Sequence, residues 1–274
     1  MAKTDFSWVN AVDLSTIVAG SESSTLLAAN LASPKTARLW RANTNSTYFT
    51  STFLTAQSVA ILALATGRDS YDSALQSWVA QLAAADTVRH RLYDAATGTG
   101  TLLYDSGVIS CGVLQGYGLH VHTPASIVAS VKSWRCDIVA TSRASYGFFD
   151  ITRAWAGTKW RPAVGIDHGW SEAWADGAQV SRGVFSGGVF PGDGPRFRVL
   201  DCSLGFMGDT DKLQAKDLTR LVGLRKQVLL VPDQDGDVYR EAILGRLASI
   251  GRATEARMTA PPVYQQPFSI IQDL

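Results

Sequence analysis

Short runs in which apolar and polar residues alternate fill much of the first 160 positions. The clearest lie at 87–93, 117–121, 134–138 and 149–155. In the last of these, Phe149, Ile151, Arg153 and Trp155 fall on one face. Because successive side chains of a strand point to opposite sides, a period of two predicts half-buried β-strands.

Turn-forming residues separate these runs. They lie at Gly67–Asp69, Thr97–Gly100, Asp105–Gly107 and Ala144–Gly147. Glycine, aspartate and serine allow the tight reversals that join antiparallel neighbours. Short strands at this spacing predict a mainly β protein in which residues 40–164 form a jelly roll.

Two stretches have helical spacing instead. Apolar residues recur at intervals of three and four along 71–83. Along 210–222, Ala215, Leu218 and Val222 share one side, and Gly223 follows where a left-handed C-cap would lie. We expect a helix in each stretch.

A second unit is expected over residues 165–274. Strands are predicted at 196–206, 228–231 and 238–247, and with the second helix they indicate a second sandwich. The polar, proline-bearing segment from Pro261 to Leu274 is expected to be an extended arm that docks on a neighbouring molecule. The N-terminal segment, residues 1–39, is expected to pack on this second unit.

Charge and apolar length limit the classes of partner. There are 25 Lys and Arg against 24 Asp and Glu, a formal net charge of +1, which argues against nucleic acid or an anionic membrane as partner. The first residues lack the apolar core of a signal peptide, and the longest apolar stretch, Val59–Ala65, is far below the roughly 20 residues that span a bilayer. We expect synthesis in the cytoplasm, and we expect Cys111, Cys136 and Cys202 to be buried thiols.

Histidines are the obvious candidates for metal ligands. His120 and His122 share one face of a predicted strand and could both reach one ion. A third ligand at recognisable spacing is lacking for this pair, and His90 and His168 lie elsewhere in the sequence. We interpret the pair as polar-face residues or subunit contacts, and we predict no metal and no cofactor.

Other motifs fall short of known sites. Asp233, Asp235 and Asp237 surround Gly236, which resembles a calcium loop. An EF-hand does not fit, because the glycine is at the fourth position instead of the sixth, and the twelfth position is Leu244 instead of glutamate. A hairpin turn with solvated carboxylates explains them better. The glycine-rich 97–101 is followed by no lysine, and no serine lies in a nucleophile elbow. We therefore predict that the protein is not an enzyme.

A group of tryptophans and an arginine is the best candidate for a binding surface. It comprises Trp155, Trp160, Arg161, Trp170 and Trp174. Indole faces stack on sugars, while arginine hydrogen-bonds to hydroxyls, so the group could be a carbohydrate platform. The alternative is packing between the two units or between subunits, where Trp and Arg are enriched. We favour the alternative.

Several short motifs resemble virion proteins of tailed bacteriophages. They lie at 84–94, 103–107, 147–157, 160–162, 169–171, 174–176, 180–182 and 186–188. The first unit is similar to the galactose-binding-like jelly roll of discoidin-type modules. The chain departs from the usual pattern at 67–81, where it inserts the predicted first helix.

The resemblance implies a structural component of the virion, at the tail tip or baseplate, of the distal tail protein type. Such a protein forms a ring homo-oligomer, with six copies as one arrangement, that links the tail tube to receptor-binding parts. Residues 165–274 would build the ring and residues 40–164 the peripheral jelly roll. Two alternatives stay open: a module that binds host surface glycans, and a tail enzyme that degrades polysaccharide.

Overall fold

The computed structural model describes residues 3–66, 70–72, 77–167, 170–177, 180–182, 189–191, 196–257 and 263–273. The chain divides into two compact units. We call Ala2–Arg161 with Val228–Leu244 the sandwich unit, and Pro162–Gln227 with Gly245–Asp273 the sheet–helix unit. Strands dominate the described residues, so the predicted mainly β class is confirmed.

The boundary lies between residues 161 and 162, close to the predicted 164. Residues 2–39 group with the sandwich unit instead of the C-terminal one. The reason is apolar packing: η1 (Ala11–Leu14) and η2 (Ala28–Ala32) bury Val12 and Leu31 in the core of the sandwich. The N-terminal segment is therefore part of the jelly-roll region.

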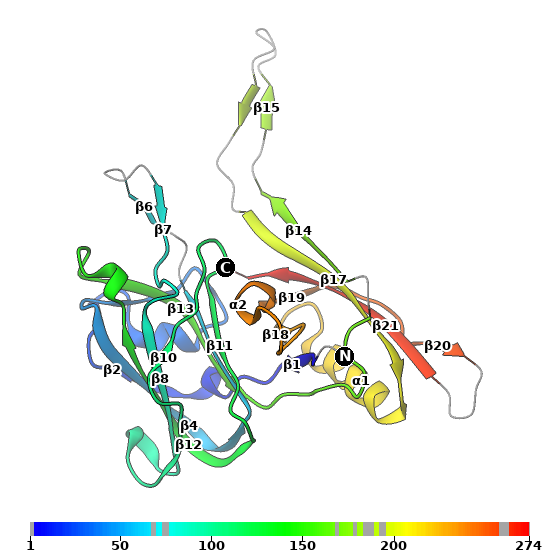
Figure 1. The fold of residues 1–274 in the computed structure, drawn as a ribbon, viewed down its shortest axis with the longest axis horizontal. Helices are drawn as coiled ribbons and strands as arrows, with labels where there is room; N and C mark the ends of the chain where they lie inside the picture. Colours follow the sequence, from blue (N-terminus) through cyan, green and yellow to red (C-terminus); the bar gives the residue numbers. More distant parts are fainter. Residues whose placement is uncertain are drawn as a thin grey trace. The chain divides into compact units, whose positions relative to one another are not determined.

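Two antiparallel sheets form the sandwich unit (Figure 1). The six-stranded sheet has the order β10 (Ile109–Ser110), β8 (Thr87–Tyr93), β12 (Val128–Val139), β4 (Ser46–Val59) and β2 (Thr16–Ala19), with β9 (Leu102–Asp105) also paired to β8. The four-stranded sheet has the order β11 (Leu119–His122), β5 (Ile61–Thr66), β13 (Phe149–Gly157) and β3 (Trp40–Ala42). The strands that alternation predicted thus belong to two facing sheets.

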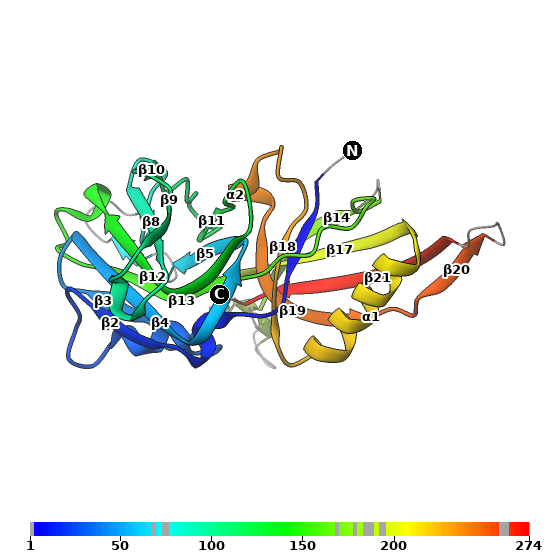
Figure 2. The same ribbon diagram turned by 90° about the horizontal axis from the view of Figure 1, so that it is seen from below.

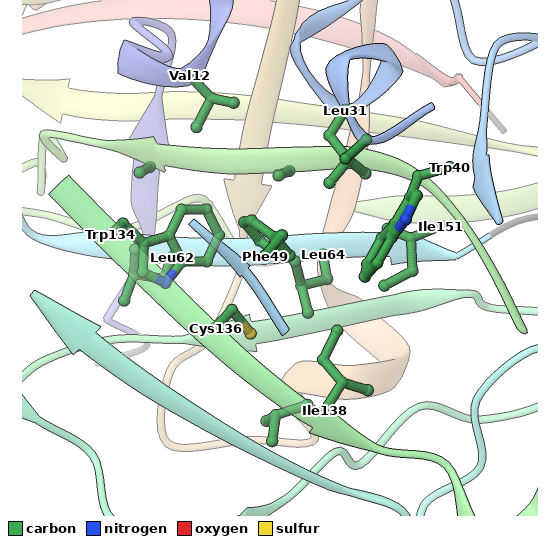
Figure 3. Packing of buried hydrophobic residues seen from close by; sticks show 14 of the residues in the cluster. Val12, Leu31, Trp40, Phe49, Leu62, Leu64, Trp134, Cys136, Ile138 and Ile151 are labelled. Carbon is green, nitrogen blue, oxygen red and sulfur yellow. The ribbon is translucent and has the colours of Figure 1, made fainter. Parts of the chain in front are cut away.

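The main core lies between these sheets (Figure 3). Phe49 and Trp134 enter it from the six-stranded sheet, and Trp40, Leu64 and Ile151 from the four-stranded sheet. All five are fully buried. Each large apolar side chain removed from water stabilises the fold by about 1.5–3 kcal/mol, so this layer is the main source of stability in the unit.

The four-stranded sheet is buried on both faces. Leu62 and Leu64 of β5 face the main core, whereas Ile61 and Ala63 belong to a second cluster that includes Leu229 of β18 (Gln227–Val231). This explains why every residue of β5 is apolar up to Thr66 rather than alternating.

A bulge in β13 changes the predicted face of its second half. The pairing of β13 with β5 shifts register between Ile151 and Arg153. After the shift, Ala154 continues the face of Phe149 and Ile151 in the main core, and Trp155 lies in the second cluster. The expectation that Phe149 and Trp155 share a face is wrong, because one extra residue reverses the alternation.

The remaining segments of the sandwich unit are short. β1 (Asp5–Ser7) pairs with β18, and its Phe6 forms a two-way backbone bridge with Trp160. The strand predicted over 238–247 is instead a one-turn helix, α2 (Val238–Glu241), followed by β19 (Ile243–Ile250).

The helix predicted over 71–83 is not formed. Residues described there are two short paired strands, β6 (Ser70–Asp72) and β7 (Ser77–Val79), and 73–76 lie outside the described residues. Aromatic and β-branched residues such as Tyr71, Trp78 and Val79 favour strands, and apolar spacing over so few residues does not exclude a hairpin.

The described part of the sheet–helix unit contains one main sheet and one long helix (Figure 2), not the predicted second sandwich. Its strands are β14 (Ser171–Asp176), β17 (Arg196–Met207), β21 (Val263–Gln272), β19 and β20 (Thr254–Arg257), and β15 (Val180–Arg182) pairs with β16 (Val189–Pro191) separately. The predicted second helix is confirmed as α1 (Asp209–Val222), which contacts β17 and β21 and buries Ala215, Leu218 and Val222. Among the described helices, none combines the length and hydropathy needed to cross a membrane.

The C-terminal segment is a central strand rather than an arm. β21 pairs with β17 on one side and with β19 and β20 on the other. Ile270 lies between Leu200 and Leu247 in one buried row. Pro267, which lacks an N–H, lies between the last pair of β19 and the first pair of β20, where a missing donor costs little.

Ending the chain at residue 262 should therefore unfold the sheet–helix unit. β17 loses one of its two partner strands, and Leu200 loses Ile270 from its buried row. In hydrogen-exchange mass spectrometry, peptides of β17 and α1 should become unprotected, while those of β8 and β12 in the sandwich unit serve as the internal control. Full protection of β17 in the truncated chain would restore the arm interpretation.

Candidate functional site

Paired strands and a tight turn bring two arginines, two aromatic rings and a carboxylate together in the sandwich unit. Arg41 of β3 lies opposite Asp150 of β13. Arg143 ends η4 (Thr141–Arg143), and the turn that follows carries Tyr146 and Phe148. We call these five residues the Arg–aromatic cluster.

The turn is held by backbone hydrogen bonds. The amides of Tyr146 and Gly147 both donate to the carbonyl oxygen of Arg143, each at 3.0 Å. Gly147 has φ +72°, a left-handed conformation that side chains disfavour, so glycine suits this position. The sequence motif Tyr-Gly-Phe therefore presents two half-buried aromatic rings from one rigid turn.

Guanidinium groups lie against both rings. The Arg41 Cζ atom is 4.3 Å from the Phe148 ring centroid, and the Arg143 Cζ atom is 4.3 Å from the Tyr146 centroid and 5.6 Å from that of Phe148. Arg143 is fully buried, and its Nη2 donates to Gln81 Oε1 at 3.2 Å. These cation–π contacts fix the ring orientations.

Arg41 and Asp150 form a bidentate ion pair. Nε and Nη2 of Arg41 donate to the two carboxylate oxygens at 2.8 and 2.7 Å. The Asp150 side chain is only 7% exposed, against 36% for Arg41, so the arginine is the more accessible partner. The hydrogen bond to Asp150 raises the pKa of Arg41, so this guanidinium stays charged at every physiological pH.

An arrangement of this kind suits an uncharged ligand with many hydroxyls. The rings offer an apolar face to C–H groups, and the ion pair offers donors and acceptors within the same cluster. The cluster could not be predicted from the sequence, because Arg41 and Asp150 are 109 residues apart. The only local signal was an aromatic residue on each side of a turn glycine.

The predicted tryptophan platform is not an exposed surface in the sandwich unit. Trp155 is 2% exposed and donates from Nε1 to Ser7 Oγ at 3.0 Å. Trp160 is 9% exposed and packs against Phe6 and Trp8, with ring centroids 5.3 and 6.0 Å away. Buried indole faces cannot stack on a sugar, so these two residues serve packing within the unit.

Arg161 and the other two tryptophans are divided between the units. Arg161 makes a bidentate pair with the buried Asp5 at 2.7 and 2.8 Å, which ties the sandwich unit to its N-terminal strand. Trp170 and Trp174 belong to the sheet–helix unit, where Trp174 on β14 is 48% exposed and Trp170 is half-buried.

Three of the four histidines meet inside the sandwich unit. His90 of β8 and His120 of β11 are fully buried, with their Nε2 atoms 2.9 Å apart. Their ring centroids are 5.2 Å apart, and their planes are inclined by 19°. His122 Nε2 is 2.6 Å from the hydroxyl of Tyr104. His168 lies outside the described residues.

The ring nitrogens of His90 and His120, which would have to bind a metal ion, are already used in hydrogen bonds. His90 Nδ1 accepts from Trp134 Nε1 at 3.3 Å, and His120 Nδ1 donates to the carbonyl of Cys111 at 2.6 Å. Both nitrogens of each ring are thus engaged. Among the described residues, no group of three or more His, Cys, Asp and Glu side chains is placed to hold a metal ion.

The three cysteines are free and buried, as predicted. Burial raises the pKa of the Cys111 and Cys202 thiols to about 12. The Cys111 and Cys202 thiols are therefore protonated and unreactive as nucleophiles at neutral pH.

Comparisons with known proteins give structural matches only: neither a family model nor a curated protein matches the sequence. The family 32 carbohydrate-binding module of NanJ from Clostridium perfringens, solved with galactose, matches at 13% identity, covering 54% of this chain and 97% of the module, with a TM-score of 0.38. A fucose-binding module from Streptococcus pneumoniae matches at 8% identity, 55% and 95% coverage and a TM-score of 0.40. A chitosan-binding module from Paenibacillus sp. IK-5 matches at 12% identity, 55% and 99% coverage and a TM-score of 0.40.

Gly112 allows α2 to approach the histidine cluster, and its replacement tests that packing. A Cβ at Gly112 would overlap the ring of Tyr239, which lies 6.1 Å from the His120 ring. Gly107 has nearly the same φ, +66° against +67°, but open space around it. In urea unfolding, Gly112→Ala should cost about 1–3 kcal/mol more than Gly107→Ala, because only the former adds a steric overlap. Equal losses in the two variants would mean that Tyr239 does not pack there.

Proposed function

We propose that the sandwich unit is a non-catalytic glycan-binding module whose ligand lies on the Arg–aromatic cluster. One observation carries the proposal: Tyr146 and Phe148 are held in fixed orientation by Arg143 and Arg41 beside the bidentate Arg41–Asp150 pair. Aromatic rings next to a planar hydrogen-bonding fork are the elements that sugar recognition requires.

Recognition would use the two kinds of surface together. The exposed parts of Tyr146 and Phe148 would contact the C–H face of a pyranose ring. Arg41, the more exposed member of the ion pair, would donate hydrogen bonds to hydroxyls, with Asp150 fixing its orientation. Because strand pairing and the turn already order these groups, binding would cost little conformational entropy.

Features of the same cluster support binding over catalysis. Asp150 accepts two hydrogen bonds from Arg41 and is almost buried, so it is poorly placed to protonate a leaving group or to activate water. A polysaccharide-degrading enzyme is the competing proposal. Release of reducing ends from a polysaccharide by the purified chain would support the enzyme and contradict the binding module.

Phe148→Ala should weaken sugar binding at least tenfold, or about 1.4 kcal/mol, because it removes one ring of the cluster. Galactose, fucose and a chitosan oligosaccharide are the probes, measured by isothermal titration calorimetry with the full chain. Tyr48→Ala is the matched control, since Tyr48 is another half-buried ring under an arginine, with the Arg135 Cζ atom 3.8 Å from its centroid. Binding that is lost equally in both variants, or absent with all probes in the wild type, would contradict the proposal.

A second candidate function is assembly, which we propose for the sheet–helix unit. Large apolar side chains are exposed on it: Trp174 at 48%, Phe206 at 58%, Leu213 at 61% and Leu224 at 56%. The two aromatic residues among them, Trp174 and Phe206, are of the type that is enriched at protein interfaces. They agree with the resemblance to virion tail-tip proteins, in which copies form a ring and contact other tail proteins.

Light scattering of the purified chain tests this assembly. We expect a mass several times that of the monomer, reduced by Trp174→Ser and Phe206→Ser but not by Phe148→Ala. A strictly monomeric wild type at high concentration would contradict self-assembly.

Immunogold microscopy of phage particles carrying the protein tests the virion proposal, for which label at the tail tip is the expected result.

A further inference from the structure

A line of hydrogen bonds joins the two sheets through the interior of the sandwich unit. It runs from Trp134 of β12 to His90 of β8, both in the six-stranded sheet, then to His120 of β11 in the four-stranded sheet, and ends on the carbonyl of Cys111. We propose that the His90–His120 pair is a proton-sensitive latch, which holds the two sheets together at neutral pH and opens in acid.

The pattern of donors and acceptors determines both tautomers. Trp134 Nε1 can only donate, so His90 accepts at Nδ1 and carries its proton on Nε2. The carbonyl of Cys111 can only accept, so His120 carries its proton on Nδ1 and accepts at Nε2. The 2.9 Å contact is then Nε2–H of His90 donating to Nε2 of His120.

An added proton has no acceptor in this line. A proton on His90 Nδ1 would face the N–H of Trp134, and a proton on His120 Nε2 would face the N–H of His90. Either event replaces one hydrogen bond with two opposed donors at a fully buried position, where an unpaired charge is costly. The neutral pair is therefore compatible with the closed sandwich, and the charged pair is not.

Among the residues that the structure describes, the groups that contact the pair offer no compensating negative charge. They are Tyr239 on α2, Trp134 on β12, the carbonyl of Cys111, and His122 on β11, which stacks on His90 and is itself hydrogen-bonded to Tyr104 on β9. The nearby carboxylates Asp86, Asp105 and Asp237 act on Cys111, Tyr104 and Tyr239 rather than on the two rings.

The direction of the pH effect follows from burial. Burial lowers the pKa of His120 from 6.5 to about 4, and it lowers the pKa of His90 well below 6.5. In the unfolded chain both would titrate near 6.5. Between these values the unfolded chain takes up protons that the folded one refuses, so stability is full above pH 6.5 and falls as the pH drops toward 4.

Urea unfolding of the full chain between pH 7.5 and 4 tests the latch, with a sandwich-unit signal such as hydrogen exchange in β8 and β11. Each of the two histidines should reduce the folding equilibrium constant about tenfold per pH unit below pH 6. Gln can donate and accept as each imidazole does but does not titrate, so His90→Gln/His120→Gln should remove most of this pH dependence. His122→Gln, two residues from His120, is the matched control: burial also lowers the pKa of His122, so this variant should lose only the share of His122 and retain that of the His90–His120 pair. An unchanged slope in the double variant would overturn the latch.

Imidazole nitrogen NMR of the wild type keeps the test independent of whether the variants fold. The expected spectrum at pH 7 has His90 protonated on Nε2 and His120 on Nδ1, and both stay neutral at pH 5.5. A charged form of either ring at pH 5.5 in the folded protein would overturn the proposal.

Discussion

One chain of aromatic contacts through the core of the sandwich unit orders almost everything else in it. Phe149 packs edge-on against Trp40, Trp40 against Phe49, and Phe49 against Trp134, with ring centroids 5.0–5.8 Å apart. Trp134 then contacts His90, which meets His120. This series of ring contacts begins and ends in the four-stranded sheet and passes through the six-stranded sheet in between. Edge-to-face pairs have a preferred geometry, so these rings fix the position of one sheet on the other in addition to burying apolar surface.

The ends of this chain coincide with the two sites of interest. At one end, Phe149 is anchored in the core, and its neighbours Phe148 and Asp150 belong to the Arg–aromatic cluster. At the other end, the last contact is a hydrogen bond between two neutral imidazoles. The packed rings between them give the cluster a rigid base, and the histidine pair makes one inter-sheet contact depend on protonation. The proposed glycan site and the proposed proton-sensitive latch thus depend on the same core.

Local patterns in the sequence were sufficient to locate strands and a helix, but not to predict which strands pair with one another. Alternation correctly located β8, β12 and β17, and apolar spacing with Gly223 located α1. The proline-rich, polar C-terminus did not reveal that β21 is a central strand, because that depends on pairing with β17 some 60–70 residues earlier. The bulge in β13 likewise depends on how that strand meets β5. Trp155 and Trp160 were placed in a candidate platform because sequence does not reveal which aromatic residues the N-terminal strand covers. The Arg41–Asp150 pair joins residues 109 positions apart, and no local motif marks it.

The most direct test of the glycan-binding account is chemical-shift mapping of the isotope-labelled full chain during titration with galactose. The account predicts that the largest shifts occur at the amides of the 143–148 turn and at the Nε–H of Arg41, while amides around Tyr48 on β4 stay unchanged. Saturable shifts centred elsewhere on the sandwich unit, with none at the turn, would contradict the assignment of the Arg–aromatic cluster as the sugar site.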